Sequence, residues 1–125
     1  MAVTFFKSNL DLTEKTNITE KLAKKTQIVG NCHIWTGKCN SSGYGFLKFT
    51  FRGRQIKCRV HRLAFFLRHN VLLMPNMHVS HLCHTKLCLR VEHLSYEPQR
   101  INNNRTVCKN EGMCYGHYAF PSCLL

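Results

Sequence analysis

Cysteine and histidine residues recur at short, regular intervals in the second half of the chain. They form the pattern Cys83-x4-Cys88-x4-His93, and thiolates and imidazoles are ligands that zinc prefers in proteins. A structural zinc site takes four ligands, so one more must come from elsewhere in the chain. Cys32 is the first candidate for that position and Cys39 is the second. The spacing predicts a zinc site whose fourth ligand is distant in sequence.

A second set of such residues needs no distant partner. It is the pattern Cys108-x5-Cys114-x2-His117-x5-Cys123, which supplies four ligands within one short segment. Residues 108–125 hold almost no apolar core of their own, so we expect bound metal to order them. In place of metal binding, the cysteines could be buried free thiols, or they could form disulfides in a secreted protein.

The charge of the chain points to a polyanionic partner. Eighteen basic and six acidic residues give a net charge of +12 over 125 residues. Two zinc ions held by thiolates would lower this only to about +10, because a thiolate releases its proton on binding zinc. Such an excess is typical of nucleic-acid-binding proteins. A merely soluble basic protein, or one that binds membrane surfaces, is the alternative.

The sequence shows no targeting or membrane-spanning segment. The N-terminus lacks the long apolar stretch and cleavage site of a signal peptide. The longest apolar runs, such as residues 71–74, are far too short to cross a bilayer. We therefore expect an intracellular protein, nuclear if the host is eukaryotic, whose reduced cysteines favour metal over disulfides.

A β-hairpin is the clearest element that the sequence predicts. Residues 45–51 and 54–60 alternate between apolar and polar side chains, and Gly53 provides the turn. One face of this hairpin, including Cys58, is expected to join the core. The other face is basic and rich in hydrogen-bonding groups: Lys48, Thr50, Gln55, Lys57 and Arg59, with Arg52 and Arg54 near the tip.

The polar face of the hairpin has the width of a two-stranded ribbon, which fits the DNA major groove. We predict that it binds DNA, with Gln55 reading bases and Lys48 contacting the phosphate backbone.

The remaining elements are shorter. A helix is predicted over residues 18–25, capped by Asn17 or Thr19, followed by a loop over residues 31–45. A helix over residues 60–69, strands over 77–82 and 94–97, and a helix over 98–107 come next. These elements predict a small, irregular, zinc-stabilised α+β domain. We divide it into an N-terminal extension (1–30), a main domain (31–107) and a C-terminal zinc-binding module (108–125).

The order of the chemical groups resembles a known family. Ser80-His81-Leu82-Cys83-His84, followed by Cys88, His93-Leu94 and Asn102, resembles the His-Cys box of ββα-metal homing endonucleases. Upstream segments also look like parts of the related HNH nucleases, namely Asn31-Cys32-His33-Ile34-Trp35-Thr36-Gly37, Gly43-Tyr44-Gly45-Phe46 and Val60-His61-Arg62-Leu63-Ala64. The resemblance extends roughly from Cys32 to Cys123 and leaves out residues 1–30.

The resemblance implies a role for each residue of the pattern. His81 would be the general base, and Asn102 would bind a catalytic magnesium ion. His84 is a rival base. Arg54 could reach the cleaved phosphate or make an ordinary backbone contact, and the sequence favours neither. The spacing around His117 departs by a few residues from that of the best-known members. The implied zinc ligands are Cys32, Cys83, Cys88 and His93 at the first site, and Cys108, Cys114, His117 and Cys123 at the second.

These residue types suit phosphodiester hydrolysis. A neutral imidazole can take a proton from water near pH 7. An asparagine carbonyl oxygen is a suitable ligand for Mg²⁺, whose remaining positions DNA oxygens and water would fill. The two zinc ions, with all four positions filled, would hold the strand, loop and helix rigid.

The function implied is a sequence-specific, double-stranded DNA endonuclease of the homing type. The alternative is a zinc-stabilised DNA-binding domain without catalysis, as in some transcription factors. The simultaneous presence of His81 and Asn102 favours the nuclease, because a pure binding domain needs neither.

The resemblance also implies a homodimer on a partly palindromic DNA site. The best-known members dimerise through a long C-terminal tail, whereas this sequence ends at Leu125. We therefore expect another surface, either residues 1–30 or an apolar C-terminal patch, and a weak dimer that forms on DNA. The patch would comprise Tyr118, Phe120, Leu124 and Leu125.

Overall fold

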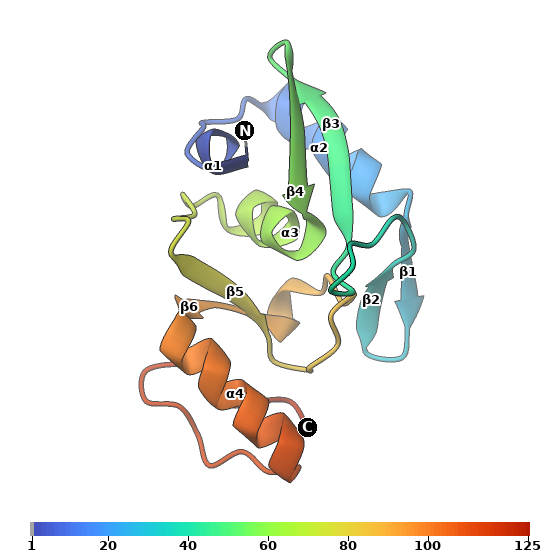
Figure 1. Cartoon of the computed structure of the whole chain (residues 1–125). Helices are drawn as coiled ribbons and strands as arrows, with labels where there is room; N and C mark the ends of the chain where they lie inside the picture. The colour runs from blue at the N-terminus through green and yellow to red at the C-terminus, as the bar shows by residue number, and fades with distance from the viewer. Residues whose placement is uncertain (1) are drawn as a thin grey trace.

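The computed structural model describes residues 2–125 of the protein (Figure 1). Within them, six strands pair as three separate two-stranded antiparallel sheets: β1 with β2, β3 with β4, and β5 with β6. The elements in chain order are α1 (Ala2–Phe5), α2 (Leu12–Ala23), β1 (Thr26–Val29), β2 (Cys32–Trp35), β3 (Phe46–Phe51), β4 (Arg54–Arg59), α3 (Val60–His69), β5 (Met77–His81), η1 (Val91–His93), β6 (Leu94–Pro98) and α4 (Gln99–Glu111).

The β3–β4 hairpin confirms the strongest prediction from the sequence. Its turn residues Arg52 and Gly53 both have positive φ angles, +50° and +76°, as a tight hairpin turn of type I′ requires. Leu47, Phe49, Phe51, Ile56 and Cys58 are buried on one face, and the polar side chains of the other face are exposed. Alternation along two paired strands thus separates a core face from a solvent face.

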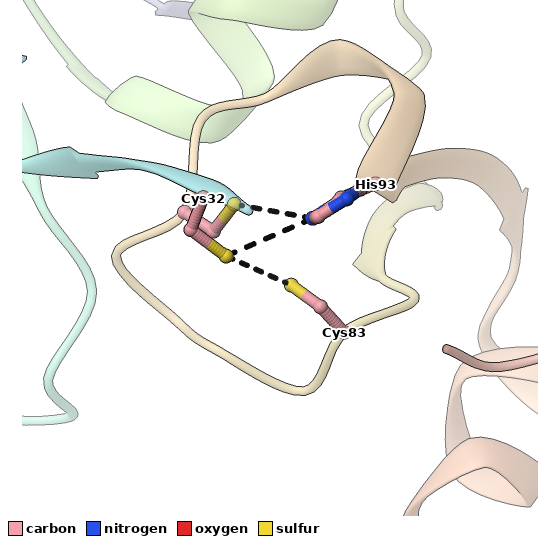
Figure 2. Close-up of side chains that lie close together, drawn as sticks. Cys32, Cys83 and His93 are labelled. Atoms are coloured by element: carbon pink, nitrogen blue, oxygen red, sulfur yellow. Dashed lines mark hydrogen bonds between the residues drawn. The ribbon is translucent and has the colours of Figure 1, made fainter. Parts of the chain in front are cut away.

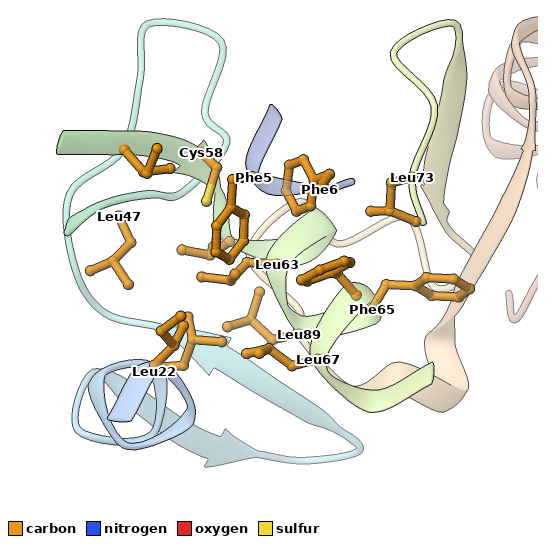
Figure 3. Close-up of a cluster of buried hydrophobic side chains, with 14 of the residues drawn as sticks. Phe5, Phe6, Leu22, Leu47, Cys58, Leu63, Phe65, Leu67, Leu73 and Leu89 are labelled. Atoms are coloured by element: carbon orange, nitrogen blue, oxygen red, sulfur yellow. The ribbon is translucent and has the colours of Figure 1, made fainter. Parts of the chain in front are cut away.

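Helix α3 packs against the buried face of this hairpin. It begins directly after β4 and ends at Asn70, which adopts the left-handed conformation. Leu63 and Val60 are completely buried at the centre of one continuous core. Figure 3 shows that α3 lies among side chains from segments far apart in the sequence, including Phe5, Leu22 and Leu89.

The N-terminal segment differs from the prediction. Helix α2 begins at Leu12, earlier than the predicted residue 18, and neither Asn17 nor Thr19 caps it. Asp11 accepts a hydrogen bond from the Glu14 amide at 2.7 Å, and Glu14 accepts one from the Asp11 amide at 3.0 Å. This capping box stabilises a helix start that hydrophobic periodicity alone did not indicate.

Residues 1–30, predicted as an extension, supply side chains to the central core. Phe5, Phe6, Ile18 and Leu22 are all buried there. The prediction of a loop over residues 31–45 was wrong at its start, because Cys32–Trp35 forms strand β2 and pairs with β1. Gly30, with φ of +59°, permits the turn between these two strands.

The last elements form a strand, a ligand-bearing loop, a second strand and a helix. Strands β5 and β6 are antiparallel, with Ser80 opposite Ser95 and His81 opposite Leu94. Helix α4 packs on both strands, completing the predicted ββα arrangement. It continues to Glu111 rather than ending near Val107, because its left-handed cap is Gly112. Cys108 is therefore carried by this helix.

Candidate active site and metal centres

The first group of ligand residues converges on one point between β2 and the loop before β6. Cys32 Sγ lies 3.8 Å from Cys83 Sγ and 3.7 Å from His93 Nδ1, and Cys88 Sγ lies 3.6 Å from the same nitrogen. Figure 2 shows Cys32, Cys83 and His93 facing one another. A tetrahedral zinc ion with ordinary bond lengths would place sulfurs about 3.8 Å apart and sulfur and nitrogen about 3.6 Å apart. The donor set and its spacing fit zinc.

Backbone hydrogen bonds fix this cluster to the core. Trp35 N donates to Leu87 O at 2.9 Å, and Leu89 N donates to His33 O at 2.7 Å, so strand β2 is tied to the loop that carries Cys88. Cys39, the second candidate for the fourth ligand, is exposed and lies outside the group.

The buried Trp35 ring occupies a space that two glycines leave free. A Cβ atom at Gly37 or Gly45 would collide with the indole, and at Gly45 it would also press on Val60. Trp35 Nε1 donates to Lys38 O at 3.0 Å, which satisfies its polar atom. The strand that supplies Cys32 is therefore positioned by tight packing.

The second group of ligand residues converges around His117. The sulfurs of Cys108, Cys114 and Cys123 lie 3.6, 3.4 and 3.6 Å from His117 Nε2. These distances again fit a tetrahedral zinc site with three thiolates and one imidazole. The segment after α4 is tied back to the main body, because Leu124 N donates to Leu82 O at 2.8 Å.

A cleft of about 350 Å³ opens where β5, the following loop and α4 meet. His81, from the end of β5, and Asn102, from the first turns of α4, both line it. Its walls are basic and aromatic, and the other lining residues are Tyr44, Val79, Ser80, His84, Lys86, Arg105, Thr106 and Lys109. The structure thus brings together the two residues for which the resemblance implied catalytic roles.

His81 is held as a neutral imidazole. Burial lowers its pKa to about 4, despite a hydrogen bond with the Cys88 backbone that raises it, while His84 and Lys86 lower it further. Its Nε2 is buried and has no hydrogen-bond partner within residues 2–125. An unpaired buried nitrogen is unfavourable, which favours a water or substrate atom as its partner in the working site.

Two aromatic rings, His61 from α3 and Tyr44 from the segment before β3, lie against the His81 side chain. The His61 ring lies 4.6 Å from that of His81, and Tyr44 stacks on His61 at 5.4 Å. The Arg59 guanidinium lies 4.5 Å from the Tyr44 ring and Lys86 Nζ lies 5.2 Å from it. The base of the polar hairpin face is therefore continuous with the cleft.

Asn102 is oriented by a neighbour that the sequence did not single out. Its Nδ2 donates to the Ser80 hydroxyl at 2.6 Å. This bond occupies the nitrogen end of the amide, so the carbonyl end is the one available to a cation. Carbonyl oxygen is a hard donor that suits Mg²⁺, and the lining of the cleft includes no carboxylate that would compete.

The predicted DNA-binding residues divide into two groups by position. Lys48, Thr50, Gln55, Lys57 and Arg59 are all exposed on the polar hairpin face. At the tip, the Arg52 guanidinium donates to Glu14 at 2.8 and 2.9 Å and to Asn9 O at 2.7 Å, so it binds the N-terminal segment. Arg54 also lies at the tip and does not line the cleft.

Sequence reasoning gave no chemical role to Tyr44, Ser80 or Lys86, all of which line the cleft. Tyr44 and Ser80 stood inside segments that carried the family resemblance, and that was their only signal in the sequence. No helix among the described residues is long and apolar enough to cross a membrane.

Comparison with known proteins identifies the family. Residues 31–120 match the family described as the zinc-binding loop region of homing endonuclease. No curated protein matches the chain. The matched segment contains the cleft and three ligands of the second cluster in addition to the whole first cluster. The chain therefore belongs to the family of the homing endonuclease zinc-binding loop region.

Proposed function

We propose that the protein is a DNA endonuclease that hydrolyses phosphodiester bonds, with two structural zinc ions and one catalytic Mg²⁺. The observation that carries this proposal is the basic cleft in which His81 and Asn102 lie together. Neither residue is needed for a binding surface alone, whereas hydrolysis needs both a proton acceptor and a ligand for a hard cation.

In this proposal, His81 removes the proton from the attacking water through its free Nε2. The hydrogen bond with the Cys88 backbone favours one ring tautomer, and burial keeps the imidazole neutral at pH 7. A phosphate entering the cleft would raise the His81 pKa from its low value, because the anion stabilises the imidazolium. Binding of the DNA phosphate would thus make His81 a stronger base in the complex than in the free protein.

Asn102 would hold the magnesium ion through its carbonyl oxygen. When bound, Mg²⁺ would stabilise charge on the phosphate and on the leaving oxygen. Lys86 and Lys109 line the same cleft and favour binding of an anionic backbone. The exposed hairpin face, continuous with the cleft through Arg59 and Tyr44, would lie in the major groove and read the sequence.

A homodimer on DNA would explain cleavage of both strands by one type of active site. Of the two candidate surfaces, the N-terminal segment uses Phe5 and Phe6 within its own core. Tyr118 and Leu125 at the C-terminal end are exposed. We therefore favour the C-terminal surface for the dimer, and sedimentation with and without the target duplex would test it.

The decisive experiment is cleavage of a random-sequence plasmid library with Mg²⁺. The native protein should give discrete cleavage sites, and His81→Ala and Asn102→Ala should each lower the rate by at least about 100-fold while DNA binding persists. Asn103→Ala is the matched control, because Asn103 is exposed on the same helix and outside the cleft.

Loss of cleavage in His84→Ala but not in His81→Ala would transfer the base role to His84. Binding without cleavage by the native protein would favour the DNA-binding domain instead.

A further inference from the structure

A buried ion pair lies directly beneath the cleft. Arg105 donates two hydrogen bonds to Glu97, at 2.7 and 2.8 Å, and both residues are almost completely inaccessible, with exposures of 2% and 0%. Burying two charges is costly unless their geometry is good and their other polar atoms are satisfied. Here Arg105 also donates to Pro121 O at 2.8 Å and to Cys123 Sγ at 3.4 Å. The position of Glu97 is therefore fixed from several sides.

Glu97 is ionised and accepts more than the Arg105 bonds. Burial raises its pKa, but hydrogen bonds from Arg105, Ser80 and Ser95 lower it, and the net effect is a pKa below the usual value. The register of the β5–β6 sheet places Ser80, Ser95 and Glu97 on the same buried face, so both serine hydroxyls lie beside this carboxylate. A carboxylate only accepts hydrogen bonds, so the Ser80 hydroxyl is the donor in its contact with Glu97. Glu97 thus determines the direction of the Ser80 hydroxyl.

Ser80 in turn determines the orientation of Asn102. With its proton directed to Glu97, the 1% exposed Ser80 can offer Asn102 only an accepting oxygen. An amide nitrogen donates and an amide oxygen accepts, so the nitrogen end must face Ser80, as the 2.6 Å bond shows. The opposite orientation would place two accepting oxygens against each other.

We propose that Glu97 and Ser80 are positioning residues that set the amide orientation of Asn102, so that its carbonyl oxygen faces the cleft. Arg105 anchors this relay and connects it to the second ligand cluster. The inference rests on the proposed function in one respect: the purpose of this amide orientation is taken to be cation binding. The orientation itself requires neither DNA nor metal in the cleft.

Ser80 and Ser95 offer a matched pair of variants. They are opposite each other in the β5–β6 sheet, both are buried on the face that carries Glu97, and both lower the pKa of that carboxyl. Only Ser80 contacts Asn102. Ser80→Ala therefore removes the relay, whereas Ser95→Ala removes a comparable bond to Glu97 and leaves the relay intact. Thermal unfolding of the zinc-loaded variants will show whether both retain the fold.

The first readout is the side-chain amide of Asn102 in ¹⁵N NMR spectra, assigned by its absence in Asn102→Ala. In the native protein and in Ser95→Ala, we expect a shifted amide proton that exchanges slowly with water. In Ser80→Ala, this proton should exchange rapidly and lose its shift. An unchanged Asn102 signal in Ser80→Ala would overturn the relay, whether or not the protein cleaves DNA.

The second readout is the Mg²⁺ concentration that gives half-maximal cleavage of the plasmid site. Loss of a residue that orients a metal ligand typically weakens metal affinity by roughly 10- to 100-fold. We expect such an increase for Ser80→Ala and little change for Ser95→Ala. If the NMR signal changes but the Mg²⁺ requirement does not, the relay exists but does not position a cation ligand, and the proposal fails. If the native protein cleaves nothing, the proposed function fails while the NMR result still decides the orientation.

Discussion

The two ligand clusters share the same residue types but differ in how they depend on the fold. The first joins Cys32 to His93, 61 residues away, and includes the completely buried Cys88. The second lies entirely within residues 108–123, and three of its four ligands are only partly buried. The first cluster therefore stabilises contacts between distant segments, whereas the second organises a short segment beside α4. Removing a ligand from each should have different consequences.

The largest effect is expected for Cys88→Ala. A structural zinc site contributes about 10–16 kcal/mol of apparent binding free energy, which is comparable to the whole stability of a small domain at about 5–15 kcal/mol. The variant should lose cooperative thermal unfolding and its near-ultraviolet circular dichroism. Cys58→Ala is the control, because Cys58 is also buried but belongs to neither cluster. A Cys88→Ala protein with the same melting temperature as the native protein would show that the first cluster does not stabilise the fold.

A smaller, local effect is expected for Cys114→Ala. Elemental analysis should show the zinc content falling from two ions per chain to one. Hydrogen exchange should become fast in residues 113–125, while β3, β4 and α3 keep their protection, because their core includes no residue of that segment. Cys39→Ala, which changes an exposed cysteine outside both clusters, should leave zinc content and exchange unchanged. Loss of protection throughout the core would remove the distinction between the two clusters.

The sequence predicted best those features that depend on local patterns. Alternation identified the β3–β4 hairpin, helical periodicity identified α3, and ligand spacing identified both clusters. The Asp11 and Glu14 pattern was also local, but it was overlooked because the helix that it starts is mostly polar. Strand β2 was missed because asparagine and glycine residues around Cys32 indicated a loop, and pairing with β1 outweighed them.

The features that could not be predicted depend on contacts between distant residues. Nothing near Ser80 in the sequence indicates that it lies between Asn102 and Glu97, since the sheet register and helix packing create that contact. The same holds for Tyr44, whose place on the His61 ring results from the fold. Such roles become visible only when β5, β6 and α4 are assembled.

Gly45→Ala tests the support of the first cluster without removing a ligand. The added Cβ would collide with Trp35 and crowd Val60, and overpacking of this kind costs about 1–3 kcal/mol. Urea denaturation should show this loss. Zinc release to a coloured chelator should accelerate only for the ion of the first cluster. The second cluster lies outside the Trp35 contacts and therefore serves as an internal control. Equal acceleration for both ions would indicate that the clusters are not independent.

The smallest effect concerns the Glu14–Arg52 ion pair, which connects α2 to the hairpin tip away from both clusters. Hydrogen bonds from Arg52 and from the Asp11 backbone lower the Glu14 pKa from 4.5 to about 2. The folded-state pKa is thus below the unfolded-state value, so the contribution of the pair is complete above about pH 5 and is lost as the pH falls toward 2. Arg52 is exposed and Glu14 is only partly buried, so water screens the pair, and Glu14→Gln should lower the melting temperature at pH 7 only slightly. The pKa itself can be tested without acid denaturation by following the ¹³C shift of the Glu14 carboxyl from pH 7 to 4.5. An unpaired glutamate would be about half protonated at the end of this range, whereas Glu14 should remain ionised. In Arg52→Gln, the Glu14 shift should move toward that of an ordinary glutamate. A native Glu14 that titrates normally would show that the hairpin tip is not held by this pair.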